Sequence, residues 1–396
     1  MADSTSGGGA ATIPIMSTLT PDYRAEFPVT REWAFLNHAS VAPLSRRAHD
    51  RILEWAADFA NHGNLREADW YREVETVRAA SARLIGATPE EIAFLKNTSE
   101  GLALVAEGLD LQPGDSVVMV DKEFPANVYP WLHLQSRGID TRTVQPGEQG
   151  RVSLEDVAAA MDSTTRLLSI SFVQYASGFR TDLAALGQLC RDRNVLLCVD
   201  AIQGLGVFPV DVAAMQIDFL SADGHKWLVS PEGAAIFYCR RELLDRLRPV
   251  SVGWKSVANY GAFANIDFRF PPTAARFECG SLNVGGIAAM GASIRLLDEV
   301  GAAEVERRVF AVTEELVQRL TAAGANVYSS RRPGEWSGIV SFEWPEGESR
   351  RLKLACLKRQ VMISYRDGRL RASPHFYSDS SDVDALLDAL ESTAQK

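Results

Sequence analysis

Two apolar runs that follow each other in the sequence constrain the fold of this chain more than any other stretch. The first, VLLCV, starts at Val195 and ends in Asp200, and the second, in DFLSA from Asp218, leads into Asp223-Gly224-His225-Lys226. Neither run alternates with polar residues, which is typical of a strand buried on both faces of a parallel sheet. Ligands bind where such strands end. We therefore expect Asp200 and Lys226 at the carboxyl edge of a parallel sheet.

An acid and a lysine at adjacent strand ends suit pyridoxal phosphate chemistry. The lysine amine forms a Schiff base with the aldehyde of this cofactor, and the carboxylate keeps the pyridine nitrogen protonated so that the ring accepts electrons. From spacing alone, a helix-capping aspartate and a solvated lysine are the commoner explanations. Asp200 and Lys226 therefore indicate a cofactor site only when the sequence around them is considered as well.

That surrounding sequence resembles the cofactor segment of class V aminotransferases, the family that includes cysteine desulfurases, isopenicillin N epimerases and kynureninases. The resemblance is carried by VDAIQGLGVFPVDV and DFLSADGHKWLVSPEGAAIFY, and further motifs extend it from about Phe35 to Tyr377. It implies fold type I of the pyridoxal phosphate enzymes, an α/β fold. Its large domain has a mostly parallel sheet of the seven-stranded type flanked by helices, and its small C-terminal domain is α+β.

Strand and helix units also alternate from about residue 90 to 240, which predicts a mostly parallel sheet from pattern alone. We expect a flexible tail over 1–19, a large cofactor-binding domain over 20–290 and a small domain over 291–396. The N-terminal segment of the large domain is expected to contribute to the small one.

Composition narrows the function classes. Hydrophobic residues make up 46% and charged residues 23% of the 396 residues, as in an ordinary globular enzyme. The net charge of -10 opposes binding to nucleic acid or anionic membranes. No apolar run is long enough to span a bilayer, so a cytoplasmic location is expected. The five cysteines are scattered without a CxxC pair, so we expect neither a metal site nor disulfides.

The phosphate of the cofactor is expected near Asn97-Thr98-Ser99-Glu100-Gly101, which opens a helix. A helix start presents free amides and the positive end of the dipole, although Thr98 or Ser99 could simply cap it. The resemblance favours phosphate binding, with His225 as a further contact. Asp223 departs from the serine that many members have, and a carboxylate there would repel phosphate. We therefore expect Asp223 to cap a turn instead.

Three more residues are assigned to the cofactor ring, Phe124 and Gln174 through the resemblance and Gln203 because it lies three residues beyond Asp200. Phe124 occupies the position of a ring that lies flat on the pyridine, where desulfurases have a histidine. Gln174 and Gln203 supply amides near the oxygen substituent of the ring, although a turn-capping role for Gln174 fits the residues equally well.

Substrate and partner contacts complete the expected site. Arg371, in LRASPHFY, matches the arginine that binds the substrate carboxylate, and its planar fork suits that task. His38 is expected either to touch the amino-acid substrate or to make a structural hydrogen bond. Ser281, in RFECGSLN, matches a hydroxyl that reaches the phosphate of the neighbouring subunit, which implies a homodimer.

The reaction is the least determined property. Phe124 cannot transfer protons as a histidine does, and Cys356 follows helical spacing, so it is interpreted as a buried helix residue. The ending RDGRLRASPHFY resembles isopenicillin N epimerase-like proteins. The main hypothesis is an epimerase, β-lyase or transaminase that works through Lys226 at the α- or β-carbon of an amino acid. The alternatives are a cysteine desulfurase or selenocysteine lyase-type carbon-sulfur lyase, and a non-catalytic cofactor-binding scaffold.

Overall fold

The large unit of the molecule is built around one seven-stranded sheet. The computed structural model describes residues 22–394, so the tail predicted over 1–19 lies outside the described residues. The strand order is β2-β8-β7-β6-β5-β3-β4. Only β8 runs antiparallel to its neighbours, and the other adjacent pairs are parallel. The seven strands are β2 (Ile92–Leu95), β3 (Ser116–Val120), β4 (Asp140–Val144), β5 (Thr165–Ser171), β6 (Leu196–Asp200), β7 (Phe219–Asp223) and β8 (Ala235–Cys239).

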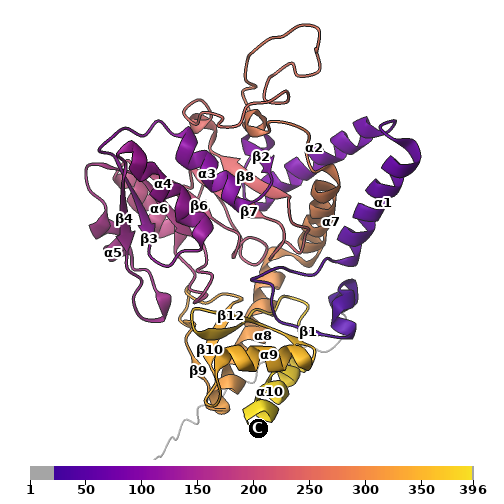
Figure 1. Ribbon diagram of the computed structural model, residues 1–396, viewed down its shortest axis with the longest axis vertical. Coiled ribbons are helices and arrows are strands. Elements are labelled where there is room, and N and C mark those ends of the chain that lie inside the picture. The colour runs from indigo at the N-terminus through magenta and orange to yellow at the C-terminus, as the bar shows by residue number, and fades with distance from the viewer. Residues whose placement is uncertain (1–21, 395–396) are drawn as a thin grey trace, which may run out of the picture.

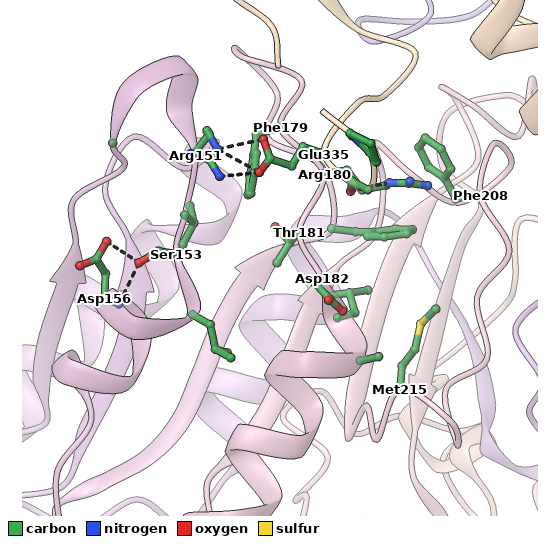
Figure 2. Close-up of a pocket in the computed structure, with 18 of the residues that line it drawn as sticks. Arg151, Ser153, Asp156, Phe179, Arg180, Thr181, Asp182, Phe208, Met215 and Glu335 are labelled. Carbon is green, nitrogen blue, oxygen red and sulfur yellow. Dashed lines mark hydrogen bonds and ion pairs between the residues drawn. The ribbon is translucent and has the colours of Figure 1, made fainter. Parts of the chain in front are cut away.

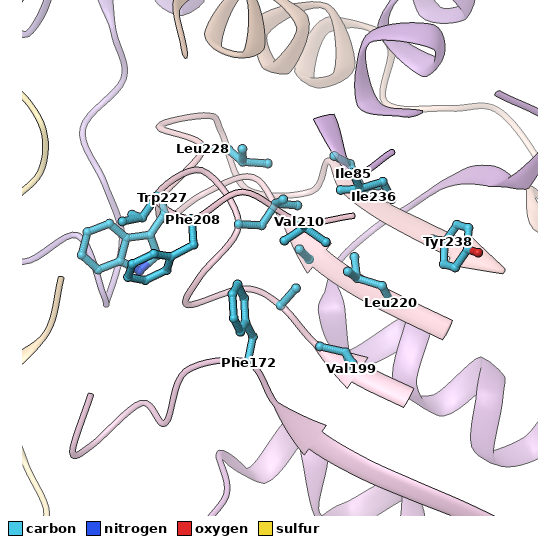
Figure 3. Packing of buried hydrophobic residues seen from close by; sticks show 14 of the residues in the cluster. Ile85, Phe172, Val199, Phe208, Val210, Leu220, Trp227, Leu228, Ile236 and Tyr238 are labelled. Carbon is cyan, nitrogen blue, oxygen red and sulfur yellow. The ribbon is translucent and has the colours of Figure 1, made fainter. Parts of the chain in front are cut away.

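The central strands are buried on both faces, as their unbroken apolar runs predict. On β6 and β7, Val199 and Leu220 belong to one hydrophobic cluster, whereas their chain neighbours Cys198 and Phe219 belong to another on the opposite face. Figure 3 shows the first of these clusters, in which Trp227 and Phe208 pack beside the strand residues. Because successive side chains of a strand point to opposite faces, each strand supplies both layers of the core.

Helices cover this sheet and connect it to the rest of the chain (Figure 1). The helix α3 lies against β7, and Gly101 allows this approach, because a Cβ there would stand 2.3 Å from the Ser221 hydroxyl. Long helices α1 and α2 pack against α7. The helices of this part are α1 (Arg46–His62), α2 (Glu67–Leu84), α3 (Thr98–Gly108), α4 (Tyr129–His133), α5 (Leu154–Ala160), α6 (Leu183–Asp192) and α7 (Val284–Val300).

The C-terminal part forms a smaller unit around an antiparallel four-stranded sheet, in the order β12-β13-β10-β9 (Figure 1). A separate two-stranded parallel pair joins β1 near the N-terminus to β11. The boundary predicted near residue 290 falls inside α7. The elements are β1 (Ala34–Phe35), α8 (Ala302–Ala322), β9 (Asn326–Val327), β10 (Val340–Glu343), α9 (Ser349–Lys358), β11 (Val361–Met362), β12 (Ser364–Arg366), β13 (Arg369–Ala372) and α10 (Ser380–Ala394).

Turns interrupt two helical stretches of the chain. The helices α1 and α2 are separated by a turn at Gly63, whose φ is 57°. The short α4 lies between two 3-10 turns. Within residues 22–394, no helix combines the length and apolar character that a membrane span requires.

Candidate active site

One cavity of about 250 Å³ lies at the carboxyl end of β6 and β7 and collects most of the residues that the sequence singled out. This volume is close to the lower end of the range for small-molecule sites. Residues of the large sheet and of the smaller C-terminal unit meet in its wall. The expected residues that line it are Thr98, Ser99, Phe124, Asp200, Gln203, His225, Lys226 and Arg371.

Lys226 and Asp200 face this cavity from adjacent strand ends. Both are buried, with 7% and 3% of their surface exposed. Burial lowers the pKa of the Lys226 amine to about 8, and attraction to Asp200 opposes part of this shift. Burial raises the pKa of Asp200 to about 6, against the hydrogen bond from the Ile202 amide. Within residues 22–394 the two side chains form no direct ion pair, and both line the cavity.

Phe124 supplies an aromatic face beside the lysine. Its ring is 42% exposed and lines the cavity, and the Lys226 Nζ atom lies 5.4 Å from the ring centroid. Tyr175 meets the ring edge-on at 5.4 Å. An exposed ring face next to a buried amine and a buried carboxylate fits the three demands of a pyridoxal ring, which are stacking, covalent attachment and a partner for the ring nitrogen.

The start of α3 borders the same cavity. Asn97 caps this helix, because its Oδ1 accepts a hydrogen bond from the Glu100 amide at 2.9 Å. Thr98 and Ser99 are therefore not needed as caps. The Thr98 hydroxyl accepts a hydrogen bond from the Asp223 amide, whereas Ser99 is exposed at the helix start. Free amides, a hydroxyl and the nearby His225 form a donor set that suits a phosphate group.

Asp223 does not cap a turn, contrary to the expectation from sequence. Its side chain is buried, and its Oδ2 lies 2.9 Å from His225 Nδ1, at ion-pair distance. Its other oxygen has no hydrogen-bond partner within the described part of the chain. Because Asp223 does not line the cavity, it meets the phosphate donor set only through His225 and through the Thr98 hydroxyl.

Arg371 reaches the cavity from β13 of the small sheet. Only 1% of its surface is exposed, and its guanidinium donates to the Tyr175 carbonyl at 2.6 Å and to the Ser40 and Ser364 hydroxyls at 2.9 Å. All three partners are neutral. Burial lowers the pKa of Arg371 to about 9, and repulsion by Arg366 adds to this shift. A buried cation without an acidic partner is suited to bind an anion from outside.

Three expected site residues lie outside this cavity. His38 is fully buried, with Nδ1 at 2.8 Å from the Ser373 carbonyl and Nε2 at 2.7 Å from the Tyr377 hydroxyl. Substrate contact by His38 is therefore wrong, since both ring nitrogens are occupied, and the structural hydrogen bond is what is found. Gln174 is buried behind the wall and donates to Glu123. Ser281 is exposed near Lys96, and its role towards a neighbouring subunit stays a prediction.

Some lining residues were not assigned a role from the sequence. Ser40 and Tyr175 hold Arg371, and Arg366 adds a second guanidinium to the wall. Ser40 follows the Asn37-His38-Ala39 segment, and Asn37 pairs with Ser373 of the small unit. The only sequence signal for Ser40 was its place next to that segment.

A larger cavity, of about 750 Å³, lies elsewhere and is shown in Figure 2. Each of its two arginines is paired with a carboxylate: Arg151 with Glu335 at 2.8 Å, and Arg180 with Glu306 at 3.3 Å. Arg180 also lies over the Phe208 ring at 4.1 Å. Since no lysine lines it and both arginines are neutralised, the smaller cavity is the candidate active site.

Known proteins share this fold and much of this sequence. Residues 41–386 match the family model described as aminotransferase class-V. A probable cysteine desulfurase of Methanothermobacter thermautotrophicus is 31% identical over 400 residues, which cover 95% of this chain and 98% of that protein.

Two solved structures confirm the fold type I prediction. A cysteine desulfurase of Thermococcus onnurineus NA1 superposes with a TM-score of 0.88 at 24% identity, over 96% of this chain and 100% of that one. A complex of the cystine C-S lyase C-DES with its product cysteine persulfide gives a TM-score of 0.86 at 23% identity, over 92% and 98%. The chain belongs to the class V aminotransferase family and is an enzyme whose cofactor is pyridoxal phosphate.

Proposed function

We propose that the protein is a carbon-sulfur lyase that eliminates sulfur from the β-carbon of an amino acid without a cysteine nucleophile of its own. The observation that carries this proposal is a cavity that unites Lys226, Asp200 and Arg371 but has no cysteine in its wall. Relatives are named cysteine desulfurases, and a protein of the same fold is a cystine C-S lyase. These likenesses favour sulfur chemistry over the epimerase and transaminase reactions of the main hypothesis.

The cysteines support the second half of the proposal. Cys356 is fully buried in α9, and burial raises the pKa of its thiol to about 11. A nucleophilic thiol needs a lowered pKa and access to substrate. The hairpin between β12 and β13 turns at Asp367 and Gly368, whose φ values are 48° and 83°, and it carries no cysteine. Within residues 22–394, no thiol lines this cavity to take sulfur from a substrate.

The cofactor would be held by the Ser99 end of α3 and His225 at its phosphate, by Phe124 at its ring face and by Asp200 at its ring nitrogen. When bound, pyridoxal phosphate stabilises the negative charge that develops at the substrate α-carbon. Arg371 binds the substrate carboxylate through charge-assisted hydrogen bonds and so fixes the orientation of the α-carbon.

Lys226 then acts as the general base. Its amine removes the α-proton, the β-carbon to sulfur bond breaks, and the electron pair leaves with the sulfur. The lowered pKa of Lys226 suits this task, because more of the amine is neutral near physiological pH.

We also propose a homodimer. The segment before α7 exposes apolar side chains on a loop that projects from the large unit (Figure 1), among them Phe263, Ile266 and Phe268. The base of this loop lies against the Ser281 segment, because a Cβ at Gly253 would stand 2.0 Å from the Cys279 carbonyl oxygen. A second copy seated here would cover the apolar loop and approach Ser281 together. Sedimentation equilibrium of the protein and of Phe263→Asp tests this; a monomeric wild type would contradict it.

Product analysis tests the proposed reaction. The holoenzyme is incubated with L-cystine, L-cysteine and L-alanine, and pyruvate, ammonia, sulfane sulfur and D-amino acids are measured. Elimination gives pyruvate and ammonia in equal amounts with released sulfur. Alanine formed from cysteine would indicate a desulfurase, D-amino acid an epimerase, and a new amino acid from added keto acid a transaminase, and each would overturn the proposal.

A further inference from the structure

The segment that joins β3 to α4 is fastened to β5 at two points. Glu123 Oε1 accepts a hydrogen bond from the Ser171 amide at 2.8 Å, and the Ser171 hydroxyl donates to Glu123 Oε2. Four residues later, Asn127 Oδ1 accepts from the Ser169 hydroxyl at 2.5 Å. Phe124 lies between these two attachments, so they set the position of its ring at the cavity.

The first attachment also holds Gln174. The Gln174 Nε2 atom donates to Glu123 Oε1 at 2.9 Å, and Gln174 follows the end of β5. An amide nitrogen carries two hydrogens, so this bond leaves the second one free in a fixed direction. The next residue, Tyr175, lines the cavity. Glu123 therefore determines how the Gln174 amide is presented behind the wall.

The buried carboxyl of Glu123 lowers the stability of the fold. Only 4% of its surface is exposed, and burial raises the pKa of its carboxyl to about 7. Its partner Ser171 pairs in register with Asp200, whose charge opposes ionisation of Glu123 as well. Burial of a carboxyl beside another carboxyl costs stability. The reaction proposed above assigns no role to Glu123.

We infer that Glu123 is a positioning residue for the cofactor. By holding the Gln174 amide it fixes the segment that carries the wall residue Tyr175, and it shares with Asn127 the fastening of Phe124. The inference rests on pyridoxal phosphate binding and not on the reaction that follows. A protein that bound the cofactor but failed to release sulfur would overturn the proposed lyase and leave this inference intact.

A double-mutant cycle of Glu123→Gln and Gln174→Ala tests this inference. Glu123→Gln keeps the shape of the side chain but presents an amide hydrogen where a donor already points. The equilibrium binding of pyridoxal phosphate to the apo-protein and the absorption maximum of the bound cofactor are measured. We expect Glu123→Gln to weaken binding roughly 10-fold alone and about threefold or less in the Gln174→Ala background. The shift in absorption maximum is expected to be no larger in the double variant than in Gln174→Ala.

The matched control is Asn127→Ala, which breaks the second attachment and leaves Gln174 untouched. Its effect on cofactor binding is expected to add to that of Gln174→Ala, because the two sites share no contact. Two results would overturn the inference: if the effects of Glu123→Gln and Gln174→Ala on cofactor binding are additive, or if Asn127→Ala couples to Gln174→Ala as strongly as Glu123→Gln does. Either result would mean that Glu123 only supports the loop in general.

A second variant keeps the test decisive if Glu123→Gln does not fold. Ser171→Ala removes the hydroxyl that fixes Glu123 Oε2 and keeps the carboxyl. We expect a smaller loss of cofactor affinity, about threefold, that again disappears in the Gln174→Ala background. A loss that persists unchanged in that background would contradict the inference.

Discussion

The two sides of the candidate active site differ in whether their buried charges have oppositely charged partners. On the side of the large sheet, Lys226 and Asp200 have opposite charges and lie at adjacent strand ends, and each moderates the pKa of the other. On the side of the small sheet, Arg371 is at least as deeply buried but has only neutral partners. On the first side, the charge of Lys226 is balanced by Asp200. On the second side, the charge of Arg371 is not balanced by an acidic side chain among its hydrogen-bond partners.

This difference indicates which ligand each side serves. A lysine and a carboxylate that line one cavity can hold a pyridoxal ring, the lysine by covalent attachment and the carboxylate at the protonated ring nitrogen. A lone buried cation costs stability until an anion arrives, so it gains most when a carboxylate binds. Changes on the large-sheet side should therefore affect the cofactor, and changes on the small-sheet side should affect the substrate.

The largest effect is expected from Lys226→Ala. Loss of the amine removes both covalent attachment and the general base, so the turnover rate should fall roughly 10²- to 10⁴-fold and the visible absorption band of the holoenzyme should change. Lys255→Ala is the matched control, because Lys255 is also buried but lies over the Tyr71 ring at 3.9 Å, away from this cavity. If the absorption band and the turnover rate are unchanged in Lys226→Ala, the large-sheet side does not bind the cofactor through Lys226.

The next effect concerns Arg371→Gln. We expect KM for the amino-acid substrate to rise roughly 10- to 100-fold, because charge-assisted hydrogen bonds to its carboxylate are lost. Cofactor affinity should stay within about twofold, and Tm should not fall, because an uncompensated buried charge is removed. Steady-state kinetics, cofactor titration and thermal unfolding measure the three quantities. An equal loss of cofactor affinity would show that the two sides are not separable.

A pH effect of about tenfold is expected on the large-sheet side. Because the pKa of Lys226 is lowered to about 8, the neutral amine that attacks the cofactor aldehyde grows from a minor to a major fraction between pH 7 and 9. The rate of cofactor capture by the apo-protein, followed by absorbance, should rise roughly 10-fold over this range and then level off.

Asp200→Asn sharpens this pH test. The attraction of Asp200 raises the pKa of Lys226, so its removal should move the midpoint of the capture profile to lower pH. The reaction of the cofactor with Nα-acetyl-lysine over the same pH range is the control, because it corrects for the ionisation of the cofactor itself. A midpoint that stays in place or moves upward would show that the pair does not interact as the geometry indicates.

The smallest effect is expected from Cys356→Ser, on the small-sheet side but outside the cavity. The rate of sulfur release should change less than about twofold, since the thiol is buried in α9 with a raised pKa. Stability should fall by about 1 kcal/mol, because a hydroxyl replaces a buried thiol. If Cys356→Ser remains folded but its rate of sulfur release falls by much more than twofold, a cysteine desulfurase would be favoured over the proposed lyase.

Sequence reasoning succeeded where function lies next to a regular pattern. Asp200 and Lys226 follow unbroken apolar strands, and the ends of neighbouring parallel strands must meet at one edge. It left two roles open for His38, substrate contact or a structural hydrogen bond. The ring lies in a buried network with Ser373 and Tyr377, although the nearby Ser40 lines the cavity. Adjacent residues in irregular segments point in different directions, so their proximity in sequence does not assign them a common role.

The sequence by itself determined the sheet, the family and the pair at its edge, because these depend on local periodicity and on short motifs. Only the tertiary structure decided the partners of Glu123, the neutral surroundings of Arg371 and the pairing of Asp223 with His225. Contacts such as Ser40 to Arg371 join segments far apart in the chain. Which groups meet across such distances is fixed by how whole elements pack, and no local pattern encodes that arrangement.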